Sequence, residues 1–180
     1  MSKTRWLVVP VLLGGLVLLT PAVAHAQKPD FSGIWVLNVE KSDDMEQKVR
    51  AGAGSTREIT KLNVQQVLTR CMHLARAAQE IEIEQSEADF KMFDREDNVR
   101  IYYIDGKKHL RETPWGEKLH TLTTWSSDDL LMSTEGKDLG KFREVYTYEG
   151  EMLVYVLQLE LKGFDNMVIV RHLYDRKGGQ

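Results

Sequence analysis

The sequence predicts a mainly β fold, an antiparallel up-and-down β-barrel of about ten strands with a helix–turn–helix cap inserted after the first strand. Three observations predict it. A strand-like segment opens the domain, a segment of helical period follows, and apolar residues alternate with polar ones from Glu80 onward. Turn residues recur about every ten positions in the alternating region, which is the spacing of an antiparallel meander.

The first predicted strand begins at Phe31 and is rich in apolar and β-branched residues. Ser42-Asp43-Asp44 then begins a helix, because a hydroxyl cap and acidic residues favour the positive end of the helix dipole. Glycines end that helix, and Ser55 and Glu58 begin a second one with capping-box spacing. Apolar residues of helical period continue, so we expect the helical cap over about residues 42–78.

Within the meander, Asp105-Gly106 gives the firmest hairpin signal, since both residues tolerate a positive φ in a two-residue turn. The near-absence of long connections favours an up-and-down barrel over a Greek-key sandwich, and closure removes the sheet edges. Leu153–Leu161 is apolar on both faces. We expect such a strand to face the lumen on one side and a helix or partner chain on the other. A monomer or a weak homodimer is expected.

The segment from Met1 to Ala26 is typical of a cleavable signal peptide. Lys3 and Arg5 precede an apolar run, and Ala24-His25-Ala26 forms a small-x-small cleavage site. The alternative is a membrane anchor, which the length of the run would allow, but prolines and glycines interrupt it. We therefore expect a protein exported to a bacterial periplasm or secreted, with no membrane insertion after cleavage and a single barrel domain over residues 27–180.

Composition excludes several classes of function. The predicted signal peptide holds two of the 24 basic residues and none of the 27 acidic ones, so the remaining 154 residues carry a net charge of −5. This acidic balance argues against nucleic acid or an anionic membrane as a partner. The single Cys71 allows no internal disulfide. No histidine pair has metal-ligand spacing, and no nucleophile elbow or phosphate loop is present, so we expect no metal, no cofactor and no catalytic residue.

The opening strand Phe31-Ser32-Gly33-Ile34-Trp35-Val36-Leu37 resembles the F-x-G-x-W-x-L strand of the calycins, the superfamily of lipocalins and intracellular fatty-acid-binding proteins. Helices after the first strand, then a meander, resemble the fatty-acid-binding branch, in which the helices cap the barrel mouth. The Ile104–Lys107 turn and the closing Leu173–Arg176 also resemble bacterial secreted lipocalin-like proteins of unassigned function. The resemblance implies that Trp35, beside Gly33, plugs one end of the barrel.

The last strand departs from the fatty-acid-binding pattern. That branch carries R-x-Y there, whose Arg and Tyr hold the ligand carboxylate, whereas alignment on Tyr174 puts His172 in the place of the Arg. Arg171 would face the other side of the strand. Histidine is a poorer carboxylate anchor than arginine.

Two hypotheses for function follow. The leading one is an exported lipocalin-like protein that binds a small apolar ligand in the barrel, because such pockets are mostly apolar with few polar groups. The candidate contacts are Tyr103, Trp125, Tyr155, His172 and Tyr174. The alternative is a non-enzymatic envelope structural or interaction protein whose barrel these side chains simply fill. An enzyme on a barrel scaffold is the least favoured interpretation.

Overall fold

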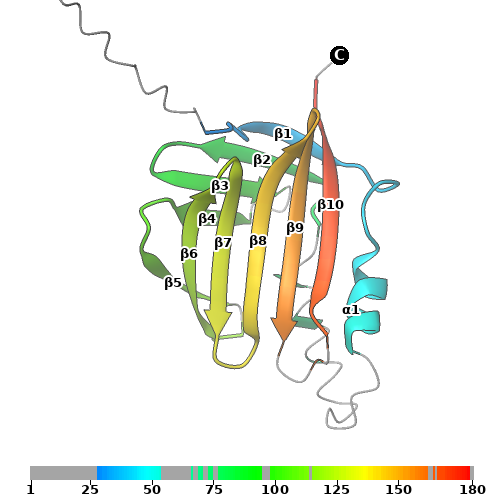
Figure 1. Ribbon diagram of the computed structural model, residues 1–180, viewed down its shortest axis with the longest axis vertical. Helices are drawn as coiled ribbons and strands as arrows, with labels where there is room; N and C mark the ends of the chain where they lie inside the picture. The colour runs from blue at the N-terminus through cyan, green and yellow to red at the C-terminus, as the bar shows by residue number, and fades with distance from the viewer. Residues whose placement is uncertain are drawn as a thin grey trace, which may run out of the picture.

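In the computed structural model, ten antiparallel strands form one sheet that curls into a nearly closed barrel (Figure 1). The structure describes residues 28–53, 66, 69–70, 73–74, 77–94, 98–113, 115–161, 164 and 166–178. The strands are β1 (Gly33–Leu37), β2 (Glu80–Gln85), β3 (Asp89–Asp94), β4 (Val99–Tyr103), β5 (Lys108–Glu112), β6 (Lys118–Ser126), β7 (Asp129–Gly136), β8 (Gly140–Glu149), β9 (Met152–Leu161) and β10 (Val168–Arg176). The fold class predicted from the sequence is confirmed.

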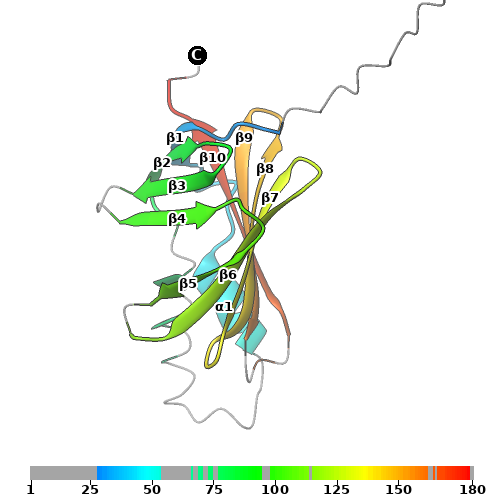
Figure 2. The same cartoon turned by 90° about the vertical axis from the view of Figure 1, so that its left-hand side faces the viewer.

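The strand order is β4-β3-β2-β1-β10-β9-β8-β7-β6-β5, so every neighbouring pair except β1 and β10 is consecutive in the chain. The β1–β10 pair joins the two halves, since Trp35 lies opposite both Ile81 of β2 and Arg176 of β10. Strands β2–β4 cross the longer strands β7–β10 at a steep angle (Figure 2).

The hairpin predicted at Asp105-Gly106 is wrong. A turn does form there, with Gly106 at a φ of 69° and the amide of Lys107 donating to the Asp105 carboxylate over 2.9 Å. However, β4 pairs with β3 and β5 pairs with β6, so the turn links the two ends of the sheet. The Asp105 side chain accepts a hydrogen bond from the turn's own backbone, so the turn can form without pairing between β4 and β5. The place where the barrel is not closed therefore lies between β4 and β5.

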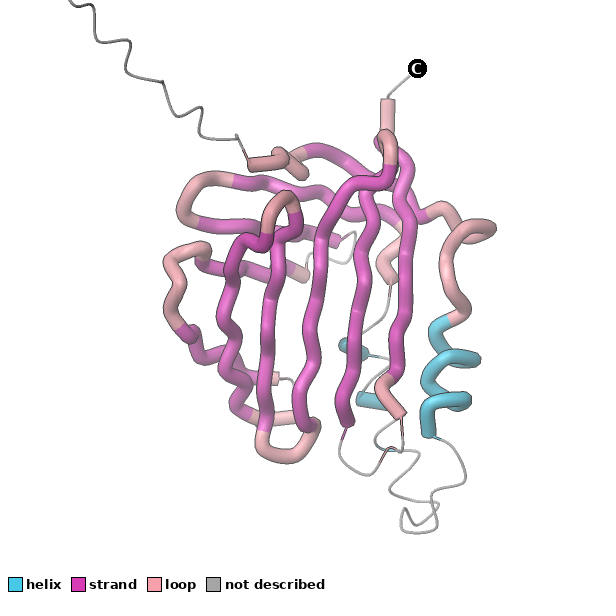
Figure 3. Tube along the Cα trace, in the orientation of Figure 1, coloured by secondary structure: helices cyan, strands magenta, loops and turns pink. Residues whose placement is uncertain are grey.

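One helix, α1 (Met45–Ala53), follows the first strand and lies beside β10 (Figure 3). The segment leading to it is bonded along β10: the amide of Asn38 donates to the carbonyl of Leu173 over 2.8 Å, and the amide of Leu173 donates to Oγ of Ser42 over 2.9 Å. Five described residues between 66 and 74 are also helical, but most of the second predicted helix lies outside the described residues, as does the predicted signal peptide. No helix in the described part of the chain is long and apolar enough to span a membrane.

Strand β9 is apolar on both faces, and over part of its length both faces are covered by other parts of the same chain. Leu153 and Leu157 face the interior, whereas Val154 and its cross-strand neighbour Leu173 lie on the outer face and are 2% and 4% exposed. Leu173 is the residue bonded to the segment before α1. The second apolar face of β9 therefore needs no partner chain at this position.

Trp35 of β1 is fully buried, and its Nε1 donates to the carbonyl of Phe31 over 2.9 Å. The Arg176 guanidinium lies 5.2 Å from the centre of the Trp35 ring. Gly33 has a φ of 139°, and a Cβ there would lie 3.0 Å from Nη2 of Arg176. Glycine is therefore required both by the backbone conformation and by the close approach of Arg176.

Candidate ligand site in the barrel interior

Five polar side chains meet inside the barrel among aromatic and aliphatic neighbours. They are Arg100 and Tyr102 of β4, Arg111 of β5, Glu144 of β8 and Tyr155 of β9, and we call them the interior cluster. Strand alternation places them there. On β4, Arg100 and Tyr102 alternate with exposed apolar residues, and on β8, Glu144 is in phase with Phe142 and Tyr146, which are buried.

Glu144 is the centre of the cluster and is 1% exposed. The hydroxyl of Tyr102 donates to both carboxylate oxygens, over 3.1 and 3.0 Å, and the hydroxyl of Tyr155 donates to Oε1 over 3.1 Å. Nη1 of Arg100 lies 3.7 Å from the same oxygen. The buried carboxylate is thus paired with one cation and hydrogen-bonded by two phenols, as a charge in a barrel interior requires.

Arg111 is the second cation of the cluster. Its Nη1 donates to the hydroxyl of Tyr102 over 3.4 Å, and its guanidinium lies 5.6 Å and 6.0 Å from the ring centres of Tyr102 and Phe142. Its Nε is buried and has no hydrogen-bond partner among the described residues. Arg111 therefore reaches Glu144 only through the hydroxyl of Tyr102, whereas Arg100 lies within ion-pair distance of it.

The protonation states follow from these contacts. Burial, together with the charge of Glu144, raises the pKa of Tyr102 to about 12, so the phenol keeps its proton and donates. Burial alone would lower the pKa of Arg100 and of Arg111, but nearby Tyr102 and Glu144 raise both above the usual value. Both arginines are charged at neutral pH.

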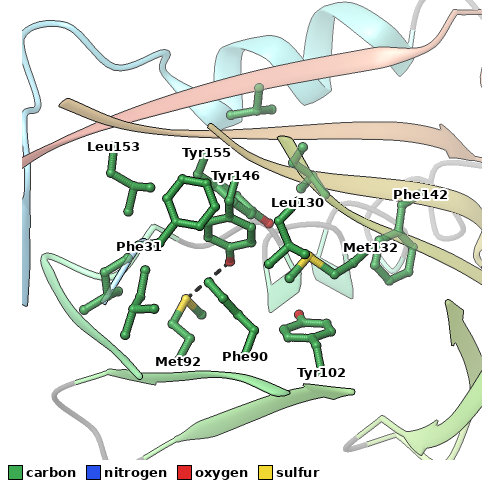
Figure 4. Close-up of a cluster of buried hydrophobic side chains, with 14 of the residues drawn as sticks. Phe31, Phe90, Met92, Tyr102, Leu130, Met132, Phe142, Tyr146, Leu153 and Tyr155 are labelled. Atoms are coloured by element: carbon green, nitrogen blue, oxygen red, sulfur yellow. Dashed lines mark hydrogen bonds between the residues drawn. The ribbon is translucent and has the colours of Figure 1, made fainter. Parts of the chain in front are cut away.

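A cavity of about 100 Å³ lies against the cluster. Its polar wall is formed by Arg100, Arg111 and Glu144, and its other lining residues are His73, Leu74, Glu112, Thr113, Leu119 and Phe142. A second cavity of about 20 Å³ lies on the other side of Arg100, among Tyr146, Tyr155 and Tyr174. The interior around them is filled: Figure 4 shows Tyr146 meeting Phe90 and Met92, which come from the opposite half of the barrel, and the hydroxyl of Tyr146 donates to the sulfur of Met92 over 3.4 Å.

The residues predicted to contact a ligand divide into three groups. Tyr155, His172 and Tyr174 face the interior, and the rings of Tyr155 and His172 stack with centres 5.9 Å apart. Trp125 lies near one barrel end, where its ring stacks on Phe31 at 6.1 Å. Tyr103 does not line the interior: it is 47% exposed, because the alternation of β4 turns Arg100 and Tyr102 inward.

His172 occupies the position where the resemblance led us to expect a carboxylate-binding arginine. It is 2% exposed, and its Nδ1 is buried without a hydrogen-bond partner among the described residues. Burial lowers the pKa of His172 below its usual value, against an opposing effect of Asp43. A neutral imidazole thus stands at this place, and the last strand supplies no interior cation there.

Four of the five cluster residues were not predicted from the sequence: Arg100, Tyr102, Arg111 and Glu144. A signal for two of them was present: Arg100 is in phase with Tyr102, and Glu144 is in phase with Phe142 and Tyr146. Opposite charges at inward positions of two strands are typical of an interior pair. No group of three or more metal-ligating side chains is found in the described part of the chain.

No protein-family model matches the chain, and no curated protein matches it. Solved structures do. The REP1-NXSQ fatty acid transporter matches with a TM-score of 0.53 and 16% identity, over 83% of this chain and 97% of its own. Lipid binding protein 8 of Caenorhabditis elegans matches with a TM-score of 0.54 and 16% identity, over 82% and 95%. The zebrafish ileal bile acid-binding protein complexed with cholic acid matches with a TM-score of 0.50 and 16% identity, over 81% and 98%. The chain therefore has a calycin-like fold of the fatty-acid-binding type.

Proposed function

We propose that this calycin-like barrel binds a small apolar ligand in its interior, in the cavity beside the interior cluster. The observation that carries the proposal is the cluster itself, in which charged and hydroxyl groups converge on a partly open cavity. Its apolar lining residues are Leu74, Leu119 and Phe142, and His73, Glu112 and Thr113 complete the lining. A mostly apolar cavity with a few converging polar groups is the usual form of a small-molecule site. Solved proteins of the same fold are named for fatty acid, lipid and bile acid binding, which supports the same class of function here.

The alternative is an envelope structural or interaction protein with a solid barrel. The filled interior favours it, because a cavity of about 100 Å³ is well below the roughly 300–1,000 Å³ of typical ligand pockets. The two functions differ in one measurable respect. A binding protein admits a small molecule to the interior, whereas a solid barrel does not.

The test has two parts. Native mass spectrometry of protein purified from its producing cells is expected to detect a co-purified small molecule. NMR titration with 1-butanol, a small neutral amphiphile, is expected to shift the amide signals of Thr113 and Leu119, which line the cavity.

Leu119→Phe fills the cavity and is expected to abolish the NMR shifts. Leu131→Phe is the matched control, because Leu131 lies on the outer face of neighbouring β7 and is half-buried. Thermal unfolding of both variants checks that they fold. Shifts confined to the outer face, with no co-purified molecule, would favour the solid barrel.

We also propose that the chain is exported through cleavage of the segment from Met1 to Ala26, which leaves residues 27–180 as a single barrel domain. The mass of the protein recovered from the periplasm or medium is expected to correspond to a chain that begins at Gln27. Ala26→Arg replaces a small residue of the cleavage site and is expected to leave the chain unprocessed. Recovery of the intact chain from the cytoplasm would refute export.

A further inference from the structure

Positive charge is in excess inside the barrel. Glu144 balances one cation, and Arg100 is the arginine whose guanidinium lies within ion-pair distance of it, at 3.7 Å. Among the described residues, Arg111 has no carboxylate within ion-pair distance, and its buried Nε has no acceptor. The Arg111 side chain is half-buried, and a charge partly removed from water without a counter-charge is costly, so an anion that reached this guanidinium would remove an energetic penalty already present in the fold.

Hydrogen-bond donors converge where such an anion would lie. Arg111 and Arg100 both line the cavity, and Thr113 lies beside them at 7% exposure. Oγ1 of Thr113 accepts from the amide of Glu117 over 2.9 Å, which leaves its hydroxyl hydrogen to donate. A guanidinium presents parallel N–H groups that match the two oxygens of a carboxylate.

The shape of the cavity limits the rest of the ligand. Beyond the charged wall it is lined by Leu74, Leu119 and Phe142, with His73 and Glu112 completing the lining, and its volume is about 100 Å³. Arg100, paired with Glu144, separates it from the smaller cavity among the tyrosines. An apolar body of a few carbons fits this space, whereas a long acyl chain does not.

We propose that the cavity beside Arg111 binds a compact organic monoanion, a carboxylate with a short apolar body, held by Arg111 with Thr113 and Arg100. The site lies on β4 and β5 at the unclosed side of the barrel, away from the β10 position of His172. The proposal rests on the proposed function and specifies its ligand by charge and size.

Isothermal titration with three ligands tests charge and size on the unmodified protein. Butyrate and butyramide have the same shape and differ in charge, and butyrate is expected to bind at least about tenfold more tightly because its bonds to Arg111 are charge-assisted. Octanoate is expected to bind no more tightly than butyrate. If its longer chain were accommodated, each added methylene would raise affinity about fourfold.

Two variants locate the site. Arg111→Met removes the unpaired cation and is expected to abolish the preference for butyrate over butyramide. The matched control is Arg143→Met on β8, whose side chain is exposed on the outer face next to Glu144, and it is expected to leave the preference unchanged. Because Arg111→Met removes a half-buried charge that has no carboxylate within ion-pair distance and keeps an unbranched apolar side chain beside Tyr102 and Phe142, it is expected to keep the fold, which circular dichroism checks.

The outcomes separate this inference from the proposed function. Equal affinity for butyrate and butyramide would overturn the anion site, and so would an unchanged preference for butyrate in Arg111→Met. Either result would still be compatible with a barrel that binds a neutral ligand. Octanoate binding far more tightly than butyrate would overturn the size limit. Failure of 1-butanol, butyramide and butyrate alike to enter the interior would overturn the proposed function, and this inference with it.

Discussion

Replacing Glu144 with Gln is expected to lower the free energy of unfolding by about 3 kcal/mol. The substitution keeps an amide oxygen that can accept from Tyr102 and Tyr155, but it removes the charge that balances Arg100. Breaking one side of a buried ion pair costs about 3–5 kcal/mol, because the other charge stays buried and unpaired. The lower end applies here, since the Arg100 side chain retains 26% exposure and Glu144 retains 2%.

Urea unfolding followed by tryptophan fluorescence measures this change. At a denaturant dependence of about 1.5 kcal/mol per molar urea, the loss corresponds to a midpoint lower by about 2 M. Arg143→Gln, the neighbouring exposed residue on β8, is the control and is expected to change stability by less than about 0.5 kcal/mol.

A double variant tests the cause of the loss. Adding Arg100→Met to Glu144→Gln removes the charge left unpaired, so the pair is expected to be coupled by more than about 1 kcal/mol. Unfolding of Glu144→Gln at the same urea concentration as Arg143→Gln would show that Glu144 does not stabilise the fold by balancing Arg100. The same conclusion would follow if the losses of stability in Glu144→Gln and Arg100→Met simply add in the double variant.

Three further changes test the fold. Gly52→Ala is expected to destabilise by about 1–3 kcal/mol in thermal unfolding, because its Cβ would collide with Val168, whereas a freely exposed helix position would gain about 1 kcal/mol. Burial holds the pKa of His172 below its usual 6.5, so the unfolded chain binds a proton before the folded protein does. The free energy of unfolding is therefore expected to fall as the pH drops below about 6.5. In His172→Phe, urea unfolding between about pH 7 and 5 is expected to show a weaker pH dependence. Thr121→Val is expected to cost about 1–3 kcal/mol, since it leaves the buried hydroxyl of Thr134 without its 2.9 Å partner, and adding Thr134→Val is expected to restore most of the loss.

The strands of the barrel could be predicted because their side chains alternate between a buried and an exposed face. Ile81 and Ile83 are 2% and 1% exposed, and the glutamates between and beside them face outward. The pairing of β4 and β5 could not be predicted, because Asp105-Gly106 specifies a tight local turn, whereas the gap in the sheet depends on partners far along the chain.

The interior cluster could not be predicted from any one strand. Arginine in a strand is ordinarily placed on the solvent side, and Arg100 faces inward because Glu144, 44 positions later, supplies its counter-charge. The in-phase tyrosines then satisfy the carboxylate. Only the folded barrel brings these groups together.

Strand β5 departs most clearly from the orientation that its sequence predicts. Its sequence, Lys-His-Leu-Arg-Glu, would by hydrophobicity alone turn Leu110 inward and Arg111 outward. The structure does the reverse: Leu110 is 59% exposed, and the Arg111 guanidinium lies between Tyr102, Phe142 and the cavity. Exposing an apolar residue and half-burying a cation that has no carboxylate within ion-pair distance both cost stability, which the contacts of the guanidinium with Tyr102 and Phe142 offset in part. Departures of this kind from local preference occur chiefly where a protein has a function to perform. The inverted strand is therefore an independent reason to look for the ligand at Arg111.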